Sequence, residues 1–365
     1  MEAVRSAGRD ADEEGMRAIR ASIVLSPDAQ ICGQCHSQGT EPDNNHPYPI
    51  AYIPGHDLLD ETVFSLVPPT GDDDWWPTGH ARQKYMQFNE WLAYGHAGAL
   101  DALKESERVI DPCMTCHSED YRWALAQIEA VETGERAAPA PESPTVNTAQ
   151  HGITCSSCHT IHIAPAAEGE AQPDFLLSQD SYTMCVECHN DTEITRGMHH
   201  PTQEMFEGET VIEEVTGTPS AHFTSEDGPK CASCHMPRVP VEAMGTRASH
   251  AFNPVLPSTE VNIEGVLDTC SSCHSDQVDV AGLQTLISDI QVDTQARLDA
   301  ARAALTDETP DWVRLALDLV EGDGSLGIHN YVYTDDLLDA VEAEVGLNGP
   351  AEATAVPDDA TTESQ

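Results

Sequence analysis

The stretch Cys155-Ser156-Ser157-Cys158-His159 contains two cysteines three positions apart, with a histidine directly after the second. This Cys-x-x-Cys-His pattern occurs six times in the 365-residue chain. The other copies are Cys32-Gly-Gln-Cys35-His36, Cys113-Met-Thr-Cys116-His117, Cys185-Val-Glu-Cys188-His189, Cys231-Ala-Ser-Cys234-His235 and Cys270-Ser-Ser-Cys273-His274. The six motifs use all twelve cysteines, so this pattern decides the class of the protein.

The spacing within the motif suits covalent attachment of haem. Two cysteines three apart lie on one side of a helical turn, where they can form thioether bonds to the two vinyl groups of one porphyrin. The histidine that follows can then direct its imidazole at the iron from the proximal side. Six copies predict six molecules of haem c, attached through all twelve cysteines. The predicted proximal ligands are His36, His117, His159, His189, His235 and His274.

Other uses of paired cysteines explain the pattern less well. A zinc ribbon uses Cys-x-x-Cys pairs but has no need of a histidine after every second cysteine. A redox dithiol of the thioredoxin type needs one such motif and not six. Structural disulfides favour wider spacing than three residues. Haem attachment therefore remains the leading interpretation.

The composition is strongly acidic and poor in aromatic residues. Apolar residues make up 39% and aromatic residues 5% of the chain, so a core built from side chains alone would be thin. Six porphyrins would supply the missing apolar volume. There are 63 acidic and 17 basic residues, a net charge of −46, which disfavours nucleic acid and anionic membrane surfaces as partners. A salty habitat would screen this charge, although an acidic protein from an ordinary habitat is the alternative.

The sequence predicts an exported protein without a membrane span. It has no run of 18 apolar residues of the kind a transmembrane helix requires. Thioether attachment of haem takes place outside the cytoplasm, so we expect the mature protein in the periplasm or extracellular space. Residues 1–26 are polar and lack the apolar region of a signal peptide. We therefore expect that a presequence has been removed or that the native start lies elsewhere.

Each iron has a second axial position, and the sequence offers many ligands for it. Eleven histidines lie outside the motifs, enough to give every haem two histidine ligands. Such ligation closes the iron to substrate and suits electron transfer. The candidate distal ligands are His96, His162, His250, His329, His80, His151, His200 and His222. In the pair His199-His200, we expect only one histidine to bind a given iron.

Methionine is a rival distal ligand that would raise the potential of its haem. The candidates are Met86, Met198, Met205 and Met244, and for each of them packing is the more ordinary role.

The predicted fold is mainly α with extensive loops, organised around the haems and closed by C-terminal helices. No long alternating pattern indicates a sheet core. The predicted regions are an N-terminal helical segment at 1–31, a first haem region at 32–131, a linker at 132–150, a second haem region at 151–275, C-terminal helices at 276–346 and a disordered tail at 347–365.

Helices are expected at specific places within these regions. One is expected from about Arg82 to Lys104, carrying His96. Apolar residues recur at helical spacing from Leu283 to Leu305 and mark a C-terminal helix. A second should start at Thr309-Pro310, and a third should hold Leu337 to Val345.

Several stretches of the chain resemble the superfamily of multihaem cytochromes that includes the cytochrome c nitrite reductases and hydroxylamine oxidoreductases. Trp91-Leu-Ala-Tyr-Gly-His96-Ala resembles an element whose histidine is a distal ligand, as does Gly327-Ile-His329-Asn. His151-Gly-Ile-Thr-Cys-Ser-Ser-Cys-His159-Thr-Ile-His162 resembles a haem segment of the superfamily, and Ile31-Cys-Gly-Gln-Cys-His36 with Tyr52-Ile-Pro-Gly55 resembles its opening segment. Cys231-Ala-Ser-Cys-His235-Met-Pro followed by Ser249-His250 resembles the late haem of the nitrite reductases, in which a following histidine ligates a neighbouring haem.

The resemblance implies the fold but not the chemistry of these enzymes. The nitrite reductases bind their catalytic haem through Cys-x-x-Cys-Lys, and none of the three lysines here follows a Cys-x-x-Cys. The hydroxylamine oxidoreductases carry eight haems and a tyrosine cross-link, whereas six motifs occur here.

The leading functional prediction is electron transfer through a chain of six haems, with potentials lowered by the negative charge. The partners would be other redox proteins or quinol-linked electron donors. A reductase of a small nitrogen or sulfur oxyanion, with one open haem, is the main alternative. It would need cationic donors such as Arg82, Arg122, Arg196, Arg238 and Arg247. A homo-oligomer or a cytochrome filament is a further alternative within electron transfer.

Overall fold

The structure is a computed structural model that describes residues 27–69, 73–107, 109–136, 139–160, 177–191, 198–242, 245–261 and 268–347. It divides into two compact units that interleave along the chain. The first unit comprises the residues up to Cys188 together with Lys230–Leu283. The second comprises His189–Pro229 and the residues from Gln284 onward. The predicted N-terminal helix, His162 and residues 348–365 of the predicted tail lie outside the described residues.

The first unit is built from short helices joined by long loops. Its helices are α3 (Gln30–His36), α4 (Gln87–Ala93), α5 (Ala99–Glu105), the 3-10 turn η1 (Asp111–Cys113), α6 (Met114–His117), α7 (Glu119–Glu132), α8 (Cys155–Cys158), α9 (Ser181–Val186), α12 (Cys231–His235) and α13 (Ser271–His274). Helices of four to seven residues are too short to be stable by themselves, so these depend on what packs against them. Among the described helices named above, only α7, with fourteen residues, reaches an ordinary length.

The single helix predicted from about Arg82 to Lys104 is wrong, because the chain forms two helices there. Helix α4 ends at Ala93, since Tyr94 is extended and its hydroxyl donates a hydrogen bond to the Gly79 carbonyl at 2.8 Å. Helix α5 begins at Ala99. His96 therefore lies in the turn between the two helices. Gly95 and Gly98 flank this turn and lower the helical propensity of the segment.

Two small antiparallel ribbons complete the first unit. Strand β1 (Gly39–Thr40) pairs with β2 (Ser65–Leu66). Strand β3 (Arg238–Val241) pairs with β4 (Gly245–Ala248), with Val239 opposite Arg247. Neither ribbon forms a core, so the prediction of a mainly helical fold with extensive loops is confirmed.

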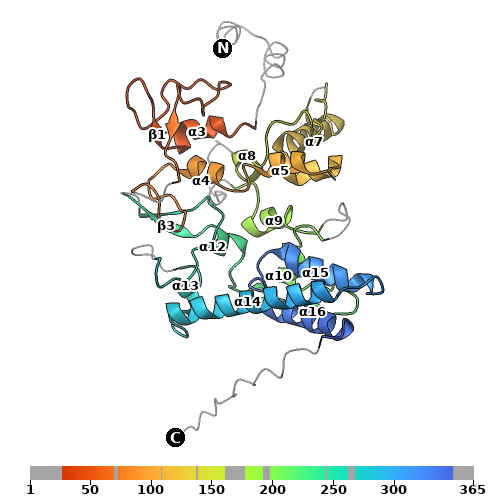
Figure 1. The fold of residues 1–365 in the computed structure, drawn as a ribbon. Coiled ribbons are helices and arrows are strands. Elements are labelled where there is room, and N and C mark those ends of the chain that lie inside the picture. The colour runs from red at the N-terminus through yellow and green to blue at the C-terminus, as the bar shows by residue number, and fades with distance from the viewer. Residues whose placement is uncertain are drawn as a thin grey trace. The chain divides into compact units, whose positions relative to one another are not determined.

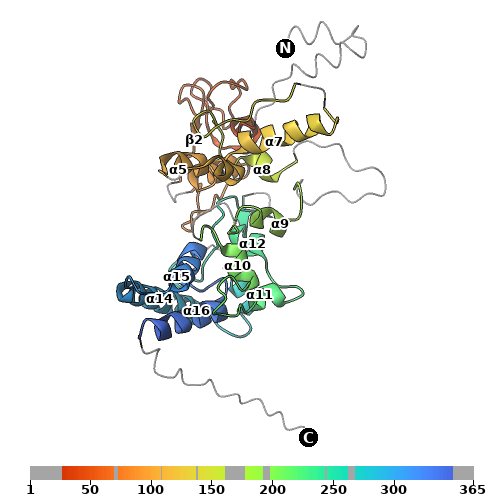
Figure 2. The ribbon, with the colours of Figure 1, turned by 90° about the vertical axis from the view of Figure 1, so that its right-hand side faces the viewer.

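The second unit has a conventional helical core. Its helices are α10 (Thr202–Glu207), α11 (Ala221–Thr224), most of α14 (Val280–Ala304), α15 (Asp311–Asp323) and α16 (Tyr331–Glu344). The three long C-terminal helices confirm the sequence prediction, and they lie side by side in both Figure 1 and Figure 2. Pro310 sits one position earlier than expected, as the N-terminal cap of α15.

The apolar faces of these helices meet in one cluster. Its buried members are Met205, Ile212, Val215, Leu298, Ala301, Val313, Ala316, Leu317, Leu319, Val320, Tyr333, Leu337, Leu338 and Val341. Helices α14 and α16 are also joined by Arg297, whose guanidinium donates to Glu342 at 2.7 Å and to Asp335 at 2.6 Å. Among the helices that the structure describes, none is both long enough and apolar enough to cross a membrane.

Candidate functional site

Five of the six cysteine motifs form a turn of helix, whereas in the motif at Cys185 the helix ends at Val186 and Cys188 and His189 follow in a turn. The histidine lies at the C-terminal end of the helical turn in α3, α6, α12 and α13. After His36 and His117 the chain becomes extended at the next serine, so the imidazole stands at the edge of its helix. Local capping explains the turns. Asp268, for example, accepts hydrogen bonds from the backbone of Cys270 and Ser271 at the start of the last motif.

The motif that begins at Cys155 is anchored by a carboxylate. Glu119 is buried and accepts hydrogen bonds from Ser157 at 2.6 Å and Ser156 at 3.3 Å, the two residues between the cysteines. Burial raises the pKa of Glu119, because a desolvated carboxylate is disfavoured. Since Glu119 starts α7 directly after the second motif, it ties two motifs together.

All twelve cysteines are free of disulfide bonds. Burial raises the pKa of Cys158 to about 11 and that of Cys270 to about 11, so these thiols are neutral at ordinary pH. A zinc site or a reactive dithiol requires thiolates. Cys158 and Cys270 are therefore better suited to thioether attachment, which leaves the sulfur uncharged, than to either of these roles.

Cysteines of different motifs lie in contact within the first unit. The side chains of Cys32 and Cys155 form a hydrogen-bonded pair, which lowers the pKa of Cys32 and raises that of Cys155. Cys116 pairs in the same way with Cys188, which lowers the pKa of Cys116 to about 7. Cys185 pairs with Cys231. The folded chain thus brings together attachment points that belong to different motifs.

Two of the proximal histidines face a second histidine. The rings of His159 and His250 are stacked, with centroids 6.1 Å apart and planes at 29°. The rings of His189 and His200 have centroids 5.8 Å apart and planes at 66°. Two imidazoles that bind one metal ion from opposite sides, each with its nitrogen about 2 Å from the metal, have centroids about 6 Å apart. The ring separations of both pairs match that expected of two imidazoles bound to one iron.

His250 is held as a neutral imidazole by its surroundings. Burial lowers its pKa to about 4, and the nearby Glu90 carboxylate only partly opposes this effect. Neutral imidazole is the form that binds a metal. Its Nδ1 atom is buried and makes no hydrogen bond to the described residues. Such an unpaired polar atom is costly in a finished core, so its presence beside His159 fits a site built for a prosthetic group.

The position of His250 depends on Glu90, which sequence reasoning missed. Glu90 is fully buried in α4 and accepts the backbone N–H of His250 at 2.7 Å. The same carboxylate pairs with Arg247 at 2.7 Å and accepts hydrogen bonds from the Ser249 hydroxyl and the Ala81 N–H. No spacing rule links position 90 to positions 247–250, so no signal in the sequence could have identified this residue.

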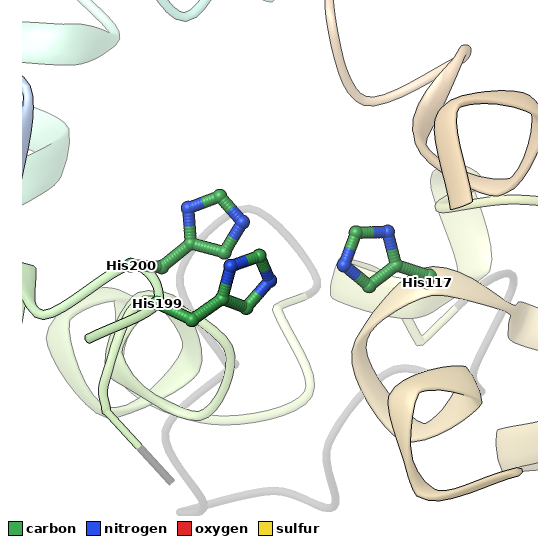
Figure 3. A group of neighbouring side chains, drawn as sticks. All are labelled: His117, His199 and His200. Carbon is green, nitrogen blue, oxygen red and sulfur yellow. The ribbon is translucent and has the colours of Figure 1, made fainter. Parts of the chain in front are cut away.

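The pair His199 and His200 lies at the start of the second unit, with ring centroids 4.1 Å apart (Figure 3). His200 has a φ of 57°, in the left-handed region that residues other than glycine and asparagine seldom adopt. The Pro201 that follows disfavours the ordinary helical conformation at His200. Strain of this kind persists where the surroundings hold a residue in one conformation, and in this conformation the His200 ring contacts that of His189.

The remaining candidate distal ligands differ in their burial and in the hydrogen bonds that their ring nitrogens make. His96 is half-buried, and this partial desolvation lowers its pKa; its ring lies edge to face against Phe252, with centroids 4.3 Å apart. His329 is hydrogen-bonded through Nδ1 to Asp323 at 2.6 Å. His80 hydrogen-bonds through both nitrogens, to the Thr78 hydroxyl and the Asn253 carbonyl, so this arrangement leaves neither for a metal.

For His151 and His222, the role of distal haem ligand stays a prediction. His151 is half-buried beside the motif that begins at Cys155, and His222 is exposed in α11.

The methionines and arginines predicted as possible ligands or donors have ordinary packing or pairing roles where the structure describes them. Met86 and Met205 are fully buried among apolar side chains, and Met198 packs against the core of the second unit. Arg247 and Arg122 are paired with carboxylates. Arg82 lies over the Trp76 ring and Arg238 bonds Thr246. Met244 and Arg196 lie outside the described residues.

Comparison with known proteins assigns this arrangement to a family. No protein-family model and no curated protein matches the chain. Among solved structures, the outer cell wall cytochrome OcwA is similar, with 32% sequence identity and a TM-score of 0.73. The match covers 91% of this chain and 68% of OcwA. The chain belongs to the multihaem c-type cytochromes. This confirms the family, the mainly helical fold and the electron-transfer function predicted from the motifs, and it supports haem c as the cofactor of this cytochrome.

Two further solved structures resemble the cytochrome more weakly. The undecahaem cytochrome from the S-layer of Carboxydothermus ferrireducens is 22% identical, with a TM-score of 0.49, and the match covers 69% of this chain and 40% of that one. The cytochrome c nitrite reductase from Desulfovibrio desulfuricans is 14% identical, with a TM-score of 0.40 and coverage of 71% and 75%.

Proposed function

We propose that this cytochrome carries six haems and conducts electrons among them outside the cytoplasm. The haems would be attached through the twelve motif cysteines, each with the histidine of its motif as proximal ligand. When bound, haem c takes up and releases one electron at its iron. The protein supplies the axial ligands, the low-polarity surroundings and the nearby charges that set the potential.

The contacts between cysteines of different motifs carry this proposal. Hydrogen-bonded thiols join Cys32 to Cys155, Cys116 to Cys188 and Cys185 to Cys231. Weaker electrostatic interactions join Cys158 to Cys185 and Cys234 to Cys273. Each of the six motifs therefore has a cysteine that interacts with a cysteine of another motif. Because thioether sulfurs lie at the porphyrin edge, connected motifs place the edges of neighbouring haems close together, as electron transfer requires.

Bis-histidine ligation supports electron transfer over catalysis. We assign His250 as the distal ligand of the haem held by His159, and His200 as that of the haem held by His189. Both assignments occupy the sixth position and exclude substrate from the iron. The pairing of Arg247 with Glu90 and of Arg122 with Glu187 also leaves these guanidinium groups neutralised, whereas an oxyanion reductase would need them as donors.

We place the protein in the periplasm or the extracellular space. OcwA, to which this chain is similar, is an outer cell wall cytochrome. We propose other redox proteins or quinol-linked electron donors as partners. A surface with a net charge of −46 favours a partner that presents cationic groups around its own cofactor. A homo-oligomer or a filament would be visible in micrographs of the purified protein.

Mass and spin state test this function together. The intact mass of the mature protein should exceed that of the chain by six haems. A double variant with Cys155→Ser and Cys158→Ser should lose one haem, whereas Ser233→Ala, inside another motif, should keep all six. Paramagnetic resonance of the resting protein should show low-spin irons. A high-spin signal that shifts on addition of nitrite would instead support the reductase alternative, and a colourless protein would refute both.

A further inference from the structure

The turn between α15 and α16 contains a buried carboxylate that has no role in the proposed function. Asp323 is the last residue of α15, and its side chain is 1% exposed. One oxygen accepts a hydrogen bond from Nδ1 of His329 at 2.6 Å. The other accepts the Ser325 N–H and the Ser325 hydroxyl, and that hydroxyl in turn accepts the N–H of His329 at 3.0 Å. Three residues thus form a closed hydrogen-bonded ring around one imidazole.

The backbone of this turn is fixed as firmly as its side chains. Gly324 and Gly327 have φ values of 73° and 93°, which other residues rarely adopt. A Cβ atom on Gly327 would also approach Ile290 at 3.1 Å. Directly after His329, the Asn330 side chain donates to the carbonyls of Met205 at 2.9 Å and Thr218 at 2.6 Å. The backbone is therefore anchored on both sides of His329.

The burial of the Asp323 carboxylate is energetically unfavourable unless its partners compensate for the lost hydration. The chain has 63 acidic residues, most of which can be solvated at the surface, and burying one costs free energy unless it is well paired. Both carboxylate oxygens of Asp323 accept hydrogen bonds: one from His329 and the other from Ser325. Metal-binding histidines commonly donate their second ring N–H to a carboxylate, which fixes the tautomer and makes the ligating nitrogen more basic.

Two histidines of the haem-attachment motifs have a weaker hydrogen-bond partner at the same ring atom, Nδ1. Nδ1 of His117 interacts with the Ala99 carbonyl at 3.0 Å, and Nδ1 of His235 with the Phe252 carbonyl at 3.0 Å. A carboxylate is a stronger acceptor than a peptide carbonyl, because it carries a full negative charge. A ligand polarised by Asp323 would donate more electron density to iron than these two and would favour the oxidised state.

We propose that Asp323 is a positioning residue, which holds His329 with Nε2 as a haem ligand and lowers the reduction potential of that one haem. This inference rests on the proposed six-haem function. On this proposal, the haem bound by His329 has a lower reduction potential than the other haems.

The test first compares two variants by redox titration followed in the visible spectrum and by paramagnetic resonance of the oxidised protein. Asp323→Asn keeps the size of the side chain and an acceptor oxygen but removes the charge. We expect one reduction step to move to higher potential, one low-spin signal to shift, and the other steps to stay in place. Asp307→Asn removes the same charge from an exposed loop and should leave both readouts unchanged.

Two further variants separate the possible failures. His329→Ala should convert one low-spin iron to high spin while the mass still shows six haems. Ser325→Ala leaves the carboxylate in place but loosens it, so it should shift the same resonance signal as Asp323→Asn, by less. The proposal is overturned if Asp323→Asn and Ser325→Ala match Asp307→Asn, or if His329→Ala leaves every iron low-spin. Fewer than six haems in the parent protein would refute the proposed function instead.

Discussion

The two units of this cytochrome differ in how many apolar side chains form their cores. The second unit buries fourteen side chains in one cluster formed by ordinary helices. In the described part of the first unit, the buried apolar residues fall into small clusters, of which the largest has five members: Ala29, Tyr52, Leu58, Phe64 and Phe88. Yet the first unit holds all twelve motif cysteines. The difference indicates that porphyrins provide much of the interior of the first unit, whereas the second unit is stabilised by its own side chains.

Helix length follows the same division. The motif helices α3, α6, α8, α9, α12 and α13 have four to seven residues, whereas α14, α15 and α16 have 25, 13 and 14. A short helix gains too few hydrogen bonds to offset the cost of nucleation. Covalent attachment at two cysteines can hold such a turn in place.

Loss of the haems should separate the two units most clearly. The chain produced in a host without haem-attachment machinery should lack a folded first unit but keep the helices α14–α16. Limited proteolysis with mass spectrometry should then release a resistant fragment from the C-terminal region, and far-UV circular dichroism should show reduced but substantial helix. Equal protection of both units would contradict this comparison. The fully haem-loaded protein, digested in parallel, is the control.

A substitution that leaves a cavity should lower the free energy of unfolding by different amounts in the two units. Leu317→Ala removes a fully buried side chain from the core of the second unit and should cost about 2–5 kcal/mol of unfolding free energy. Leu58→Ala, in the small cluster beside the first motif, should cost an amount at the lower end of that range, because the surrounding structure is also tied to haem. Denaturant unfolding followed by circular dichroism measures both. A larger loss for Leu58→Ala would reverse our assignment of the two cores.

The charged contact between α14 and α16 should contribute less than the apolar core. Arg297→Met removes a buried guanidinium from Glu342, which is 7% exposed, and from Asp335 and Asp339, which are 40% and 58% exposed. Because water screens two of the three partners, we expect a loss of about 1–3 kcal/mol in the free energy of unfolding. Arg302→Met, whose partners are 40% and 43% exposed, should cost less than about 1 kcal/mol. Equal effects of the two variants would show that burial does not govern these pairs.

The smallest expected effect depends on pH. Burial raises the pKa of Glu204 in α10, and one of its oxygens is buried without a hydrogen-bond partner. The folded state therefore binds this proton more tightly than the unfolded state, and the resulting stabilisation is lost as pH rises through the elevated pKa. Glu204→Gln should remove this part of the pH dependence of unfolding, whereas Glu209→Gln, at an exposed site, should retain it. Parallel pH profiles for parent and Glu204→Gln would exclude the effect.

Much of the site could be read from the sequence because haem attachment is a local reaction. Two cysteines and a histidine within five residues carry all the atoms that the linkage needs, so the motifs predict the cofactor wherever they occur. The helices α14–α16 were predictable for a related reason, since a sustained apolar stripe such as Trp312 to Leu319 has only one periodic structure that buries it.

The pairing of ligands could not be read in this way. His250 faces His159 because Glu90, far away in the chain, is buried against the backbone of His250. His96 lies in a turn and not in a helix, because Tyr94 reaches back to Gly79. Asp323 and His329 are near in sequence, yet their hydrogen bond depends on the left-handed turns at Gly324 and Gly327.

By itself, then, the sequence determined which residues can bond covalently to haem, the class of cytochrome to which the chain belongs, and which segments form the C-terminal helices. Only the tertiary structure decided which cysteine motifs lie in contact, which histidines face each other at a distance suited to one iron, and which imidazole has a carboxylate behind it. The reason is physical: attachment chemistry acts between neighbours along the chain, whereas ligation and tuning act between atoms that packing alone brings together.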